Sequence, residues 1–175
     1  MSIFKIVFAG PVGSGKSTAI KTLSDFDPVE SEELASDDVR NMKSHTTVAM
    51  DYGAIELDDG TQIHLYGTPG QARFSFIWSI VKENAIGTIL LIDHTYRMAT
   101  EEIMEYLLAF DDGVTPLIVG LSKSPTRIND NEQFIKEQFK SLGKYYPVIS
   151  IDPRSKRDLQ KAVLLLTCIH LASVN

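Results

Sequence analysis

The N-terminal part of the chain joins an apolar run to a glycine-rich loop, and this pair restricts the fold more than any other feature. The apolar, β-branched run Ile3–Ala9 predicts a buried strand. The next residues are Gly10-Pro11-Val12-Gly13-Ser14-Gly15-Lys16-Ser17, which match the pattern G-x-x-x-x-G-K-[ST] of a phosphate-binding loop. Residues 18–23 then predict a helix. Strand, loop and helix start in this order are the context in which such a loop works.

The chemistry of this loop belongs mainly to its backbone. Glycines allow successive N–H groups to turn inward on a phosphate, and the helix N-terminus adds its positive dipole end. Lys16 is expected to reach the β- and γ-phosphates, and the Ser17 hydroxyl to bind Mg²⁺. A chance match in a glycine-rich turn is disfavoured by the flanking strand and helix, so we expect a nucleoside triphosphate ligand. The nucleotide-binding candidates here are Gly10, Val12, Gly13, Ser14, Gly15, Lys16, Ser17 and Thr18.

Length, charge and cysteine usage narrow the class of protein. A chain of 175 residues is expected to form a single domain over residues 1–175, and its net charge of −6 disfavours a general nucleic-acid binder. The one cysteine, Cys168, leaves no disulfide framework and indicates a reducing compartment. Because it lies in an apolar run, we expect it in the core. No signal peptide, membrane span or lipidation motif is recognisable, so we expect a cytoplasmic protein without a membrane anchor of its own.

Hydrophobic patterning predicts alternating strands and helices. Asp58-Asp59-Gly60 between two alternating runs predicts an antiparallel hairpin. Phe74, Ile77, Trp78 and Val81 lie at helical spacing and predict a helix packed into the core, with Trp78 alternatively at the edge of a partner surface. Further strands are predicted over residues 86–93, 115–121 and 146–151, and helices over residues 99–110, 131–142 and 155–172. The fold class is therefore a three-layer α/β phosphate-loop NTPase, with a mixed six-stranded sheet and helices on both faces.

The order of these elements resembles that of the Ras-like small GTPases over nearly the whole chain. Thr47-Val48-Ala49-Met50-Asp51-Tyr52 is similar to the switch I segment, in which a threonine leads into the second strand. Gly67-Thr68-Pro69-Gly70-Gln71-Ala72-Arg73-Phe74 is similar to switch II, usually Asp-x-x-Gly-Gln. Both strings most resemble bacterial small GTPases of the gliding-polarity type and of the type encoded in conservon operons. Those proteins are paired with Roadblock-domain proteins.

The resemblance implies a GTP/GDP switch that requires Mg²⁺ and interacts with a protein effector or GTPase-activating protein of Roadblock type. The metal ligands would be Ser17 and Thr47, with Thr46 as the alternative to Thr47. The Gly70 N–H would donate to the γ-phosphate, and Gln71 would act with Lys16 in catalysis by orienting the attacking water. For the base, the resemblance implies Lys123, Asp152 and Pro153.

Two departures from the family pattern bear on hydrolysis. Gly67 stands where the family usually has the aspartate behind the metal, and Asp51 and Asp93 are candidate substitutes. Val12 stands where many Ras-like loops have glycine, and its branched side chain would crowd Gln71 or an incoming arginine. We therefore expect slow turnover. An arginine finger would come from Arg40, Arg73 or a partner.

A third departure concerns base selection. Ser122-Lys123-Ser124-Pro125 replaces the family motif Asn-Lys-x-Asp, and Pro125 cannot accept the hydrogen bonds that an aspartate accepts from guanine. Asp130 is a nearby carboxylate that could replace it, and Asp152-Pro153-Arg154 matches the family's Ser-Ala-Lys only loosely. ATP therefore remains an alternative to GTP as the bound nucleotide.

Three functions are compatible with the sequence. The leading one is a small GTP-binding protein that switches between nucleotide states and hydrolyses GTP slowly. The main alternative is a pseudo-GTPase scaffold that binds GTP or ATP without efficient turnover. A small-molecule kinase with the same loop is disfavoured, because arginines are few and scattered and the hairpin is unusual for that class.

Overall fold

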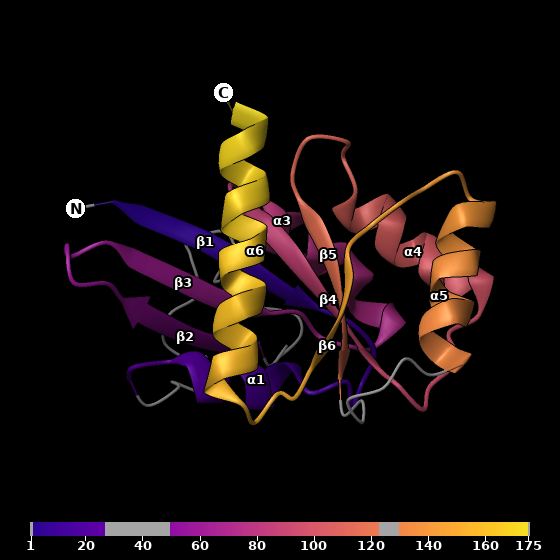
Figure 1. Cartoon of the computed structure of the whole chain (residues 1–175), viewed down its shortest axis with the longest axis horizontal. Helices are drawn as coiled ribbons and strands as arrows, with labels where there is room; N and C mark the ends of the chain where they lie inside the picture. The colour runs from indigo at the N-terminus through magenta and orange to yellow at the C-terminus, as the bar shows by residue number, and fades with distance from the viewer. Residues whose placement is uncertain (1, 27–49, 123–129, 175) are drawn as a thin grey trace.

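The computed structural model describes residues 2–26, 50–122 and 130–174, which form one six-stranded sheet with helices on both faces (Figure 1). The strand order is β2-β3-β1-β4-β5-β6. β2 runs antiparallel to β3, and the other neighbouring strands are parallel. The strands are β1 (Ile3–Ala9), β2 (Asp51–Glu56), β3 (Gln62–Gly67), β4 (Gly87–Asp93), β5 (Leu117–Ser122) and β6 (Val148–Ile151). The predicted mixed sheet is confirmed.

The helices form two layers around this sheet. They are α1 (Lys16–Leu23), the 3₁₀ helix η1 (Ala72–Ile77), α3 (Trp78–Lys82), α4 (Thr100–Phe110), α5 (Asp130–Ser141) and α6 (Lys156–Val174). Helices α1 and α6 cover one face, whereas α3, α4 and α5 cover the other (Figure 1). The three-layer α/β arrangement is therefore confirmed.

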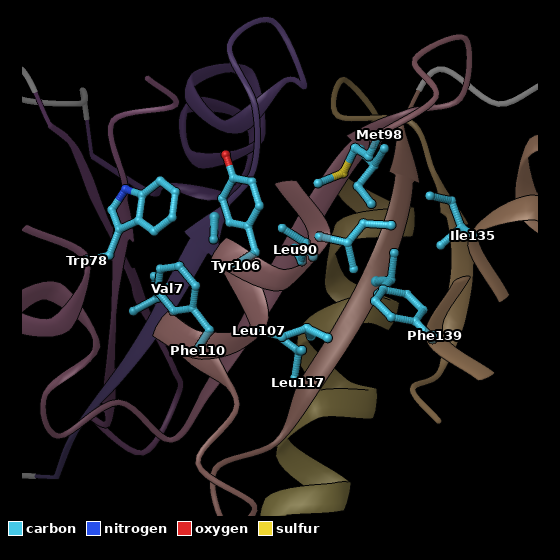
Figure 2. Close-up of a cluster of buried hydrophobic side chains, with 14 of the residues drawn as sticks. Val7, Trp78, Leu90, Met98, Tyr106, Leu107, Phe110, Leu117, Ile135 and Phe139 are labelled. Carbon is cyan, nitrogen blue, oxygen red and sulfur yellow. The ribbon is translucent and has the colours of Figure 1, made fainter. Parts of the chain in front are cut away.

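Each face of the sheet has its own hydrophobic core. In the core under α1 and α6, Ile20 and Leu166 pack against the buried strand residues Phe8 and Ile89. The other core is aromatic at its centre. Figure 2 shows Trp78, Tyr106 and Phe110 grouped together, with the Trp78 and Tyr106 rings stacked at 4.6 Å between centroids.

The hairpin turn and the 74–81 segment show where the local sequence pattern predicts the structure correctly and where it does not. Gly60 adopts φ +77° in the turn between β2 and β3, a conformation that favours glycine. Residues 74–81 were predicted as one helix, but the segment is wound as the 3₁₀ helix η1 before α3 begins at Trp78. Of the four residues predicted to pack in the core, Ile77, Trp78 and Val81 are buried, whereas Phe74 is only half-buried. Trp78 therefore belongs to the core and not to a surface edge.

The prediction that Cys168 lies in the core is wrong, because its side chain is exposed on α6. The buried face of this helix is formed by Leu159, Ala162, Val163 and Leu166. Cys168 follows Leu166 by two positions, which places it about 200° around the helix. The apolar run therefore passes around the whole helix, with Leu164 exposed as well.

Candidate functional site

The loop after β1 has the backbone shape that its glycines predict. Gly10, Gly13 and Gly15 have φ values of +138°, +78° and +102°. A Cβ atom at Gly10 would collide with the backbone carbonyl of Leu91, so this position requires glycine for space as well as for conformation. Helix α1 begins at Lys16, directly after these turns. The loop therefore presents backbone N–H groups and a helix N-terminus together.

Lys16 is folded back over this loop. Its Nζ donates to the carbonyl oxygens of Gly10 at 2.7 Å and Pro11 at 2.8 Å, and it lies 3.5 Å from Ser14 Oγ. Burial lowers the pKa of the Lys16 amine from its usual value of 10.5 to about 8, and the nearby Asp51 carboxylate opposes part of this shift. A buried ammonium group whose partners are neutral carbonyls is ready to exchange them for an anion.

A cavity of about 450 Å³ opens beside Lys16 and brings together residues from three parts of the chain. The phosphate loop and α1 contribute Val12, Gly13, Lys16 and Ser17, while the start of β2 contributes Asp51. The segment after β3 contributes Thr68, Pro69, Gly70, Gln71, Arg73 and Phe74. The predicted catalytic pair Lys16 and Gln71 and the predicted ligands Ser17 and Gly70 thus line the same cavity.

The segment after β3 is anchored just before Gly70, at Thr68 and Pro69. Thr68 is buried, and its backbone N–H donates to Phe8 O at 2.9 Å. The indole N–H of Trp78 donates to Pro69 O at 3.0 Å. A Cβ atom at Gly70 would lie 2.6 Å from the backbone nitrogen of Val12, so the two loops are in close backbone contact. Sequence reasoning missed the Trp78 bond, since helical spacing indicated only that this residue packs in the core.

Gln71 and Arg73 are exposed on this segment. Arg73, one of the arginine-finger candidates, has its guanidinium 4.8 Å from the centre of the Phe74 ring and lines the cavity. Val12 also lines it with 69% of its surface exposed. The branched side chain predicted to crowd Gln71 therefore borders the same space as Gln71.

Ser17 and Asp51 form a polar pair at the edge of the cavity. The Ser17 hydroxyl donates to Asp51 Oδ2 at 2.7 Å. Hydroxyl and carboxylate oxygens suit a hard cation such as Mg²⁺, which keeps several waters and binds phosphates as well. The oxygen chemistry at this edge therefore fits Mg²⁺, and the basic, glycine-lined part of the cavity fits a phosphate chain. Among the described residues, no group of three or more His, Cys, Asp or Glu side chains is placed to hold a metal ion.

The other candidate carboxylate, Asp93, lies in a different cavity. Its Oδ1 accepts hydrogen bonds from the backbone N–H and hydroxyl of Thr95, at 2.9 and 2.8 Å. This second cavity, of about 330 Å³, is lined by Asp93, Thr95 and Tyr96 together with Pro11, Val12, Gly13 and Ser14. Ser17 and Lys16 are absent from that lining. Of the two candidate substitutes, the structure therefore places only Asp51 next to Ser17.

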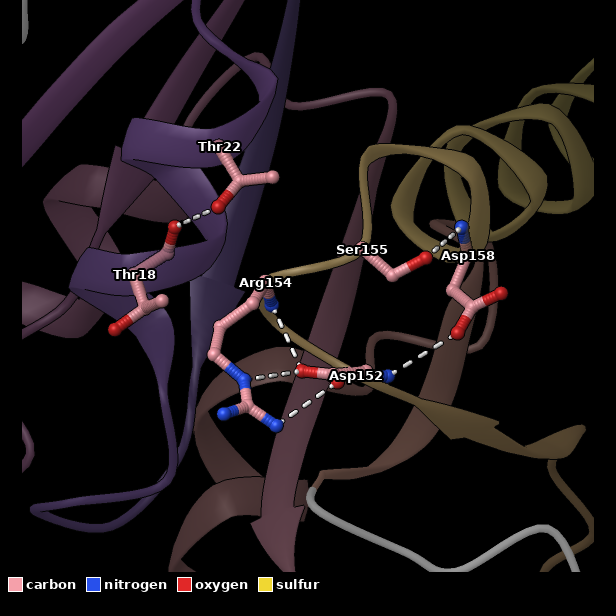
Figure 3. Close-up of polar contacts among 6 residues, drawn as sticks. All are labelled: Thr18, Thr22, Asp152, Arg154, Ser155 and Asp158. Atoms are coloured by element: carbon pink, nitrogen blue, oxygen red, sulfur yellow. Dashed lines mark hydrogen bonds and ion pairs between the residues drawn. The ribbon is translucent and has the colours of Figure 1, made fainter.

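The loop between β6 and α6 packs against the phosphate loop. Pro153 is buried, and its ring lies 2.7 Å from where a Cβ of Gly15 would be. Figure 3 shows Asp152 bonded by Arg154, whose Nε and Nη2 donate to its two carboxylate oxygens at 3.0 and 3.1 Å. These bonds from Arg154 lower the pKa of the Asp152 carboxyl. Pro153 thus lies beside the phosphate loop, with Asp152 directly before it, and their contact with a base stays a prediction.

Thr18 occupies a more peripheral place than the other candidates of the phosphate loop. It is exposed on the first turn of α1, and its carbonyl oxygen accepts a bond from the Thr22 hydroxyl at 2.8 Å (Figure 3). Four predicted residues lie outside the described residues, namely Arg40, Thr46, Thr47 and Lys123. Their roles stay predictions.

Comparisons with known proteins agree with this fold. A family model described as "Conserved hypothetical ATP binding protein" matches residues 26–169. The Ras-related protein Rab-8A of Gallus gallus is 24% identical over 164 residues, which cover 90% of this chain and 72% of that protein. This similarity supports the predicted relation to the Ras-like superfamily.

Solved structures show the same arrangement of strands and helices. The Arl6 small GTPase of Trypanosoma brucei, with a bound nucleotide analogue, superposes with a TM-score of 0.68 at 13% identity, covering 98% of this chain and 99% of that one. Bacterial selenocysteine-specific elongation factor EF-Sec superposes with a TM-score of 0.69 at 20% identity. The chain is covered completely in that comparison but spans only 30% of the elongation factor. No helix among the described residues is long and apolar enough to cross a membrane.

Proposed function

We propose that this chain, which belongs to the family described as conserved hypothetical ATP binding proteins, is a small GTP-binding protein that acts as a nucleotide-dependent switch with slow hydrolysis. The Ras-related relative and the G-domain fold support the general class. The nucleotide would be held by the phosphate loop, with Mg²⁺ held by Ser17 and Thr47. The bound cation would neutralise charge on the β- and γ-phosphate oxygens.

The observation that supports a switch is the contact between the two loops that border the cavity. The Gly70 backbone lies against Val12, and Gln71 lines the same space as Lys16. The γ-phosphate, which a triphosphate has and a diphosphate lacks, would meet the Gly70 backbone. The position of this loop would therefore depend on which nucleotide is bound. Thr47, from the segment before β2, would supply a second contact that depends on which nucleotide is bound.

Slow hydrolysis is proposed from two features of the cavity. Val12 lines the same cavity as Gln71, so its branched side chain would take up part of the space that Gln71 needs to orient a water molecule. Arg73 contacts the Phe74 ring, so this ring competes with a phosphate for its guanidinium. A partner that supplied an arginine would raise turnover by about 10³–10⁵-fold. We propose a Roadblock-type protein for that role or for the effector, in keeping with the resemblance to gliding-polarity and conservon GTPases.

Base selection is the part of the function that the local chemistry supports least. Pro153 has no N–H to donate to a purine, and the Asp152 carboxylate is already bonded to Arg154. Pro125 brings no carboxylate to the preceding loop. We therefore propose weak discrimination between guanine and adenine nucleotides, with Lys123 lying along the base.

A second function is favoured by Gly67 together with Val12. Without an aspartate at position 67 and with a branched side chain beside Gln71, the same cavity would hold a nucleotide without efficient turnover. The chain would then be a pseudo-GTPase scaffold. Single-turnover phosphate release separates the two, because a switch releases phosphate in a reaction that depends on Gln71, whereas a scaffold releases none. In either case we propose one domain over residues 1–175 and a cytoplasmic location.

The first experiment is a competition titration of nucleotide-stripped protein with fluorescent GDP, GTP, ADP and ATP in Mg²⁺. We expect binding of all four with less than about 100-fold preference for guanine, and much weaker binding in Lys16→Ala. A guanine preference above this value would show that other residues read the base. Wild-type protein that binds none of the four would refute the proposed function.

A further inference from the structure

The Ser17–Asp51 pair has a geometry that directs the serine oxygen toward a cation. The Ser17 hydroxyl donates a hydrogen bond to Asp51 Oδ2 at 2.7 Å, so the lone pairs of Ser17 Oγ remain for a second partner. Ser17 belongs to the first turn of α1, and Asp51 is the first residue of β2. Both line the 450 Å³ cavity next to Lys16. The hydroxyl is therefore oriented before any ligand arrives.

Strand register explains why Asp51 reaches this place. Asp51 pairs with Gly67 across the antiparallel β2–β3 ladder, and Gly67 also pairs with Phe8 on β1. A Cβ atom at Gly67 would lie 3.0 Å from both Cβ and Oδ2 of Asp51. A side chain at position 67 and the carboxylate of Asp51 would therefore compete for one volume. Glycine at position 67 leaves that volume to Asp51.

Resting on the proposed function, we infer that Asp51 is the positioning residue for Mg²⁺. It holds the Ser17 hydroxyl in orientation and supplies the negative charge beside the metal that the family's usual aspartate would supply from position 67. The lining of the cavity supports this assignment, since Asp51 shares it with Ser17 and Lys16. A carboxylate facing a hard cation and its waters is the usual arrangement for Mg²⁺ in phosphate-binding sites.

The test measures metal affinity through nucleotide release, independently of turnover. Release of fluorescent GDP, or of fluorescent ADP where the titration favours adenine, is followed at buffered Mg²⁺ concentrations. Asp51→Asn keeps the shape of the side chain but removes its charge, and we expect the Mg²⁺ midpoint to rise by about 10–100-fold. Without Mg²⁺, the release rates of Asp51→Asn and wild type are expected to agree within about threefold. Asp58→Asn, an exposed carboxylate in the β2–β3 turn, is the matched control and is expected to behave as wild type.

A second variant keeps Asp51 and perturbs it sterically. Gly67→Ala places a Cβ 3.0 Å from the carboxylate and 2.9 Å from the end of the flexible Ile20 side chain, so we expect the same rise in the Mg²⁺ midpoint. Unchanged midpoints in folded Asp51→Asn and Gly67→Ala, with Mg²⁺-dependent release in wild type, would overturn the inference alone. A wild type that binds no nucleotide would overturn the proposed function and this inference with it.

Discussion

Replacement of Trp78 tests whether the core and the cavity are mechanically linked. The Trp78 side chain is 1% exposed and stacks on Tyr106 at 4.6 Å. Its N–H donates to Pro69 O at 3.0 Å, directly before Gly70. Trp78→Phe keeps an aromatic ring but removes this bond, which is expected to lower the free energy of unfolding by about 1–2 kcal/mol. Trp78→Ala also empties the ring volume and is expected to cost about 3–5 kcal/mol.

The functional consequence is a weaker preference for triphosphate over diphosphate. The Trp78 bond restrains the Pro69 carbonyl, so its loss makes ordering of the Gly70 loop more costly by about 1 kcal/mol, or about fivefold in affinity. Urea unfolding followed by far-UV circular dichroism measures stability, because Trp78 is the single tryptophan and its replacement removes the fluorescence signal. Tyr106→Phe keeps the stacked ring and the Pro69 bond, and is expected to retain the nucleotide preference. Equal stability of Trp78→Phe and wild type, or an equal loss of preference in Tyr106→Phe, would refute the reasoning.

Three further predictions concern the cavity itself. Gly70→Ala places a Cβ 2.6 Å from the backbone nitrogen of Val12, so the loop must move, and we expect a loss of triphosphate preference of about tenfold or more in a competition titration. The pKa of Lys16 is lowered to about 8 in the free protein, and bound phosphate would favour its charged form. Nucleotide affinity should therefore fall about tenfold from about pH 7 to about pH 9, whereas Lys16→Ala should show weak binding and no such slope. Gln71→Ala is expected to slow single-turnover phosphate release by about 10²-fold or more at unchanged nucleotide affinity, and equal release rates would contradict its assigned role.

The phosphate loop and the β2–β3 hairpin could be predicted because both depend on local sequence. Three glycines with positive φ, a preceding apolar strand and a following helix are specified within about twenty residues of chain. The β2–β3 hairpin could be predicted from neighbouring residues as well, since Gly60 with φ +77° closes a short turn. Cys168 was placed wrongly for the converse reason. An uninterrupted apolar run along α6 does not tell which of its residues face the sheet, and packing against α1 and the strands decides it.

The contacts around the site were predictable only as alternatives, because they join residues far apart in the chain. Asp51 and Asp93 were equal candidates in the sequence, and the choice between them depends on the β2–β3 register, which places Asp51 opposite Gly67. The bond between Trp78 and Pro69 depends on η1 being wound as a 3₁₀ helix between them. The roles of Thr47 and Lys123 stay predictions, since both lie outside the described residues.

The glycines of the phosphate loop serve different physical purposes, although one motif contains them. Gly10 lies against the Leu91 carbonyl and Gly15 against the Pro153 ring, so each lets a neighbouring segment approach the loop closely. Gly13 has open space around its Cβ position and is required only for its φ of +78°. Two of the three glycines therefore contact β4 or the loop before α6, which are themselves distant in sequence. The motif specifies how these segments pack around the loop as well as what the loop binds, and for this reason a match to it predicts the fold together with the ligand.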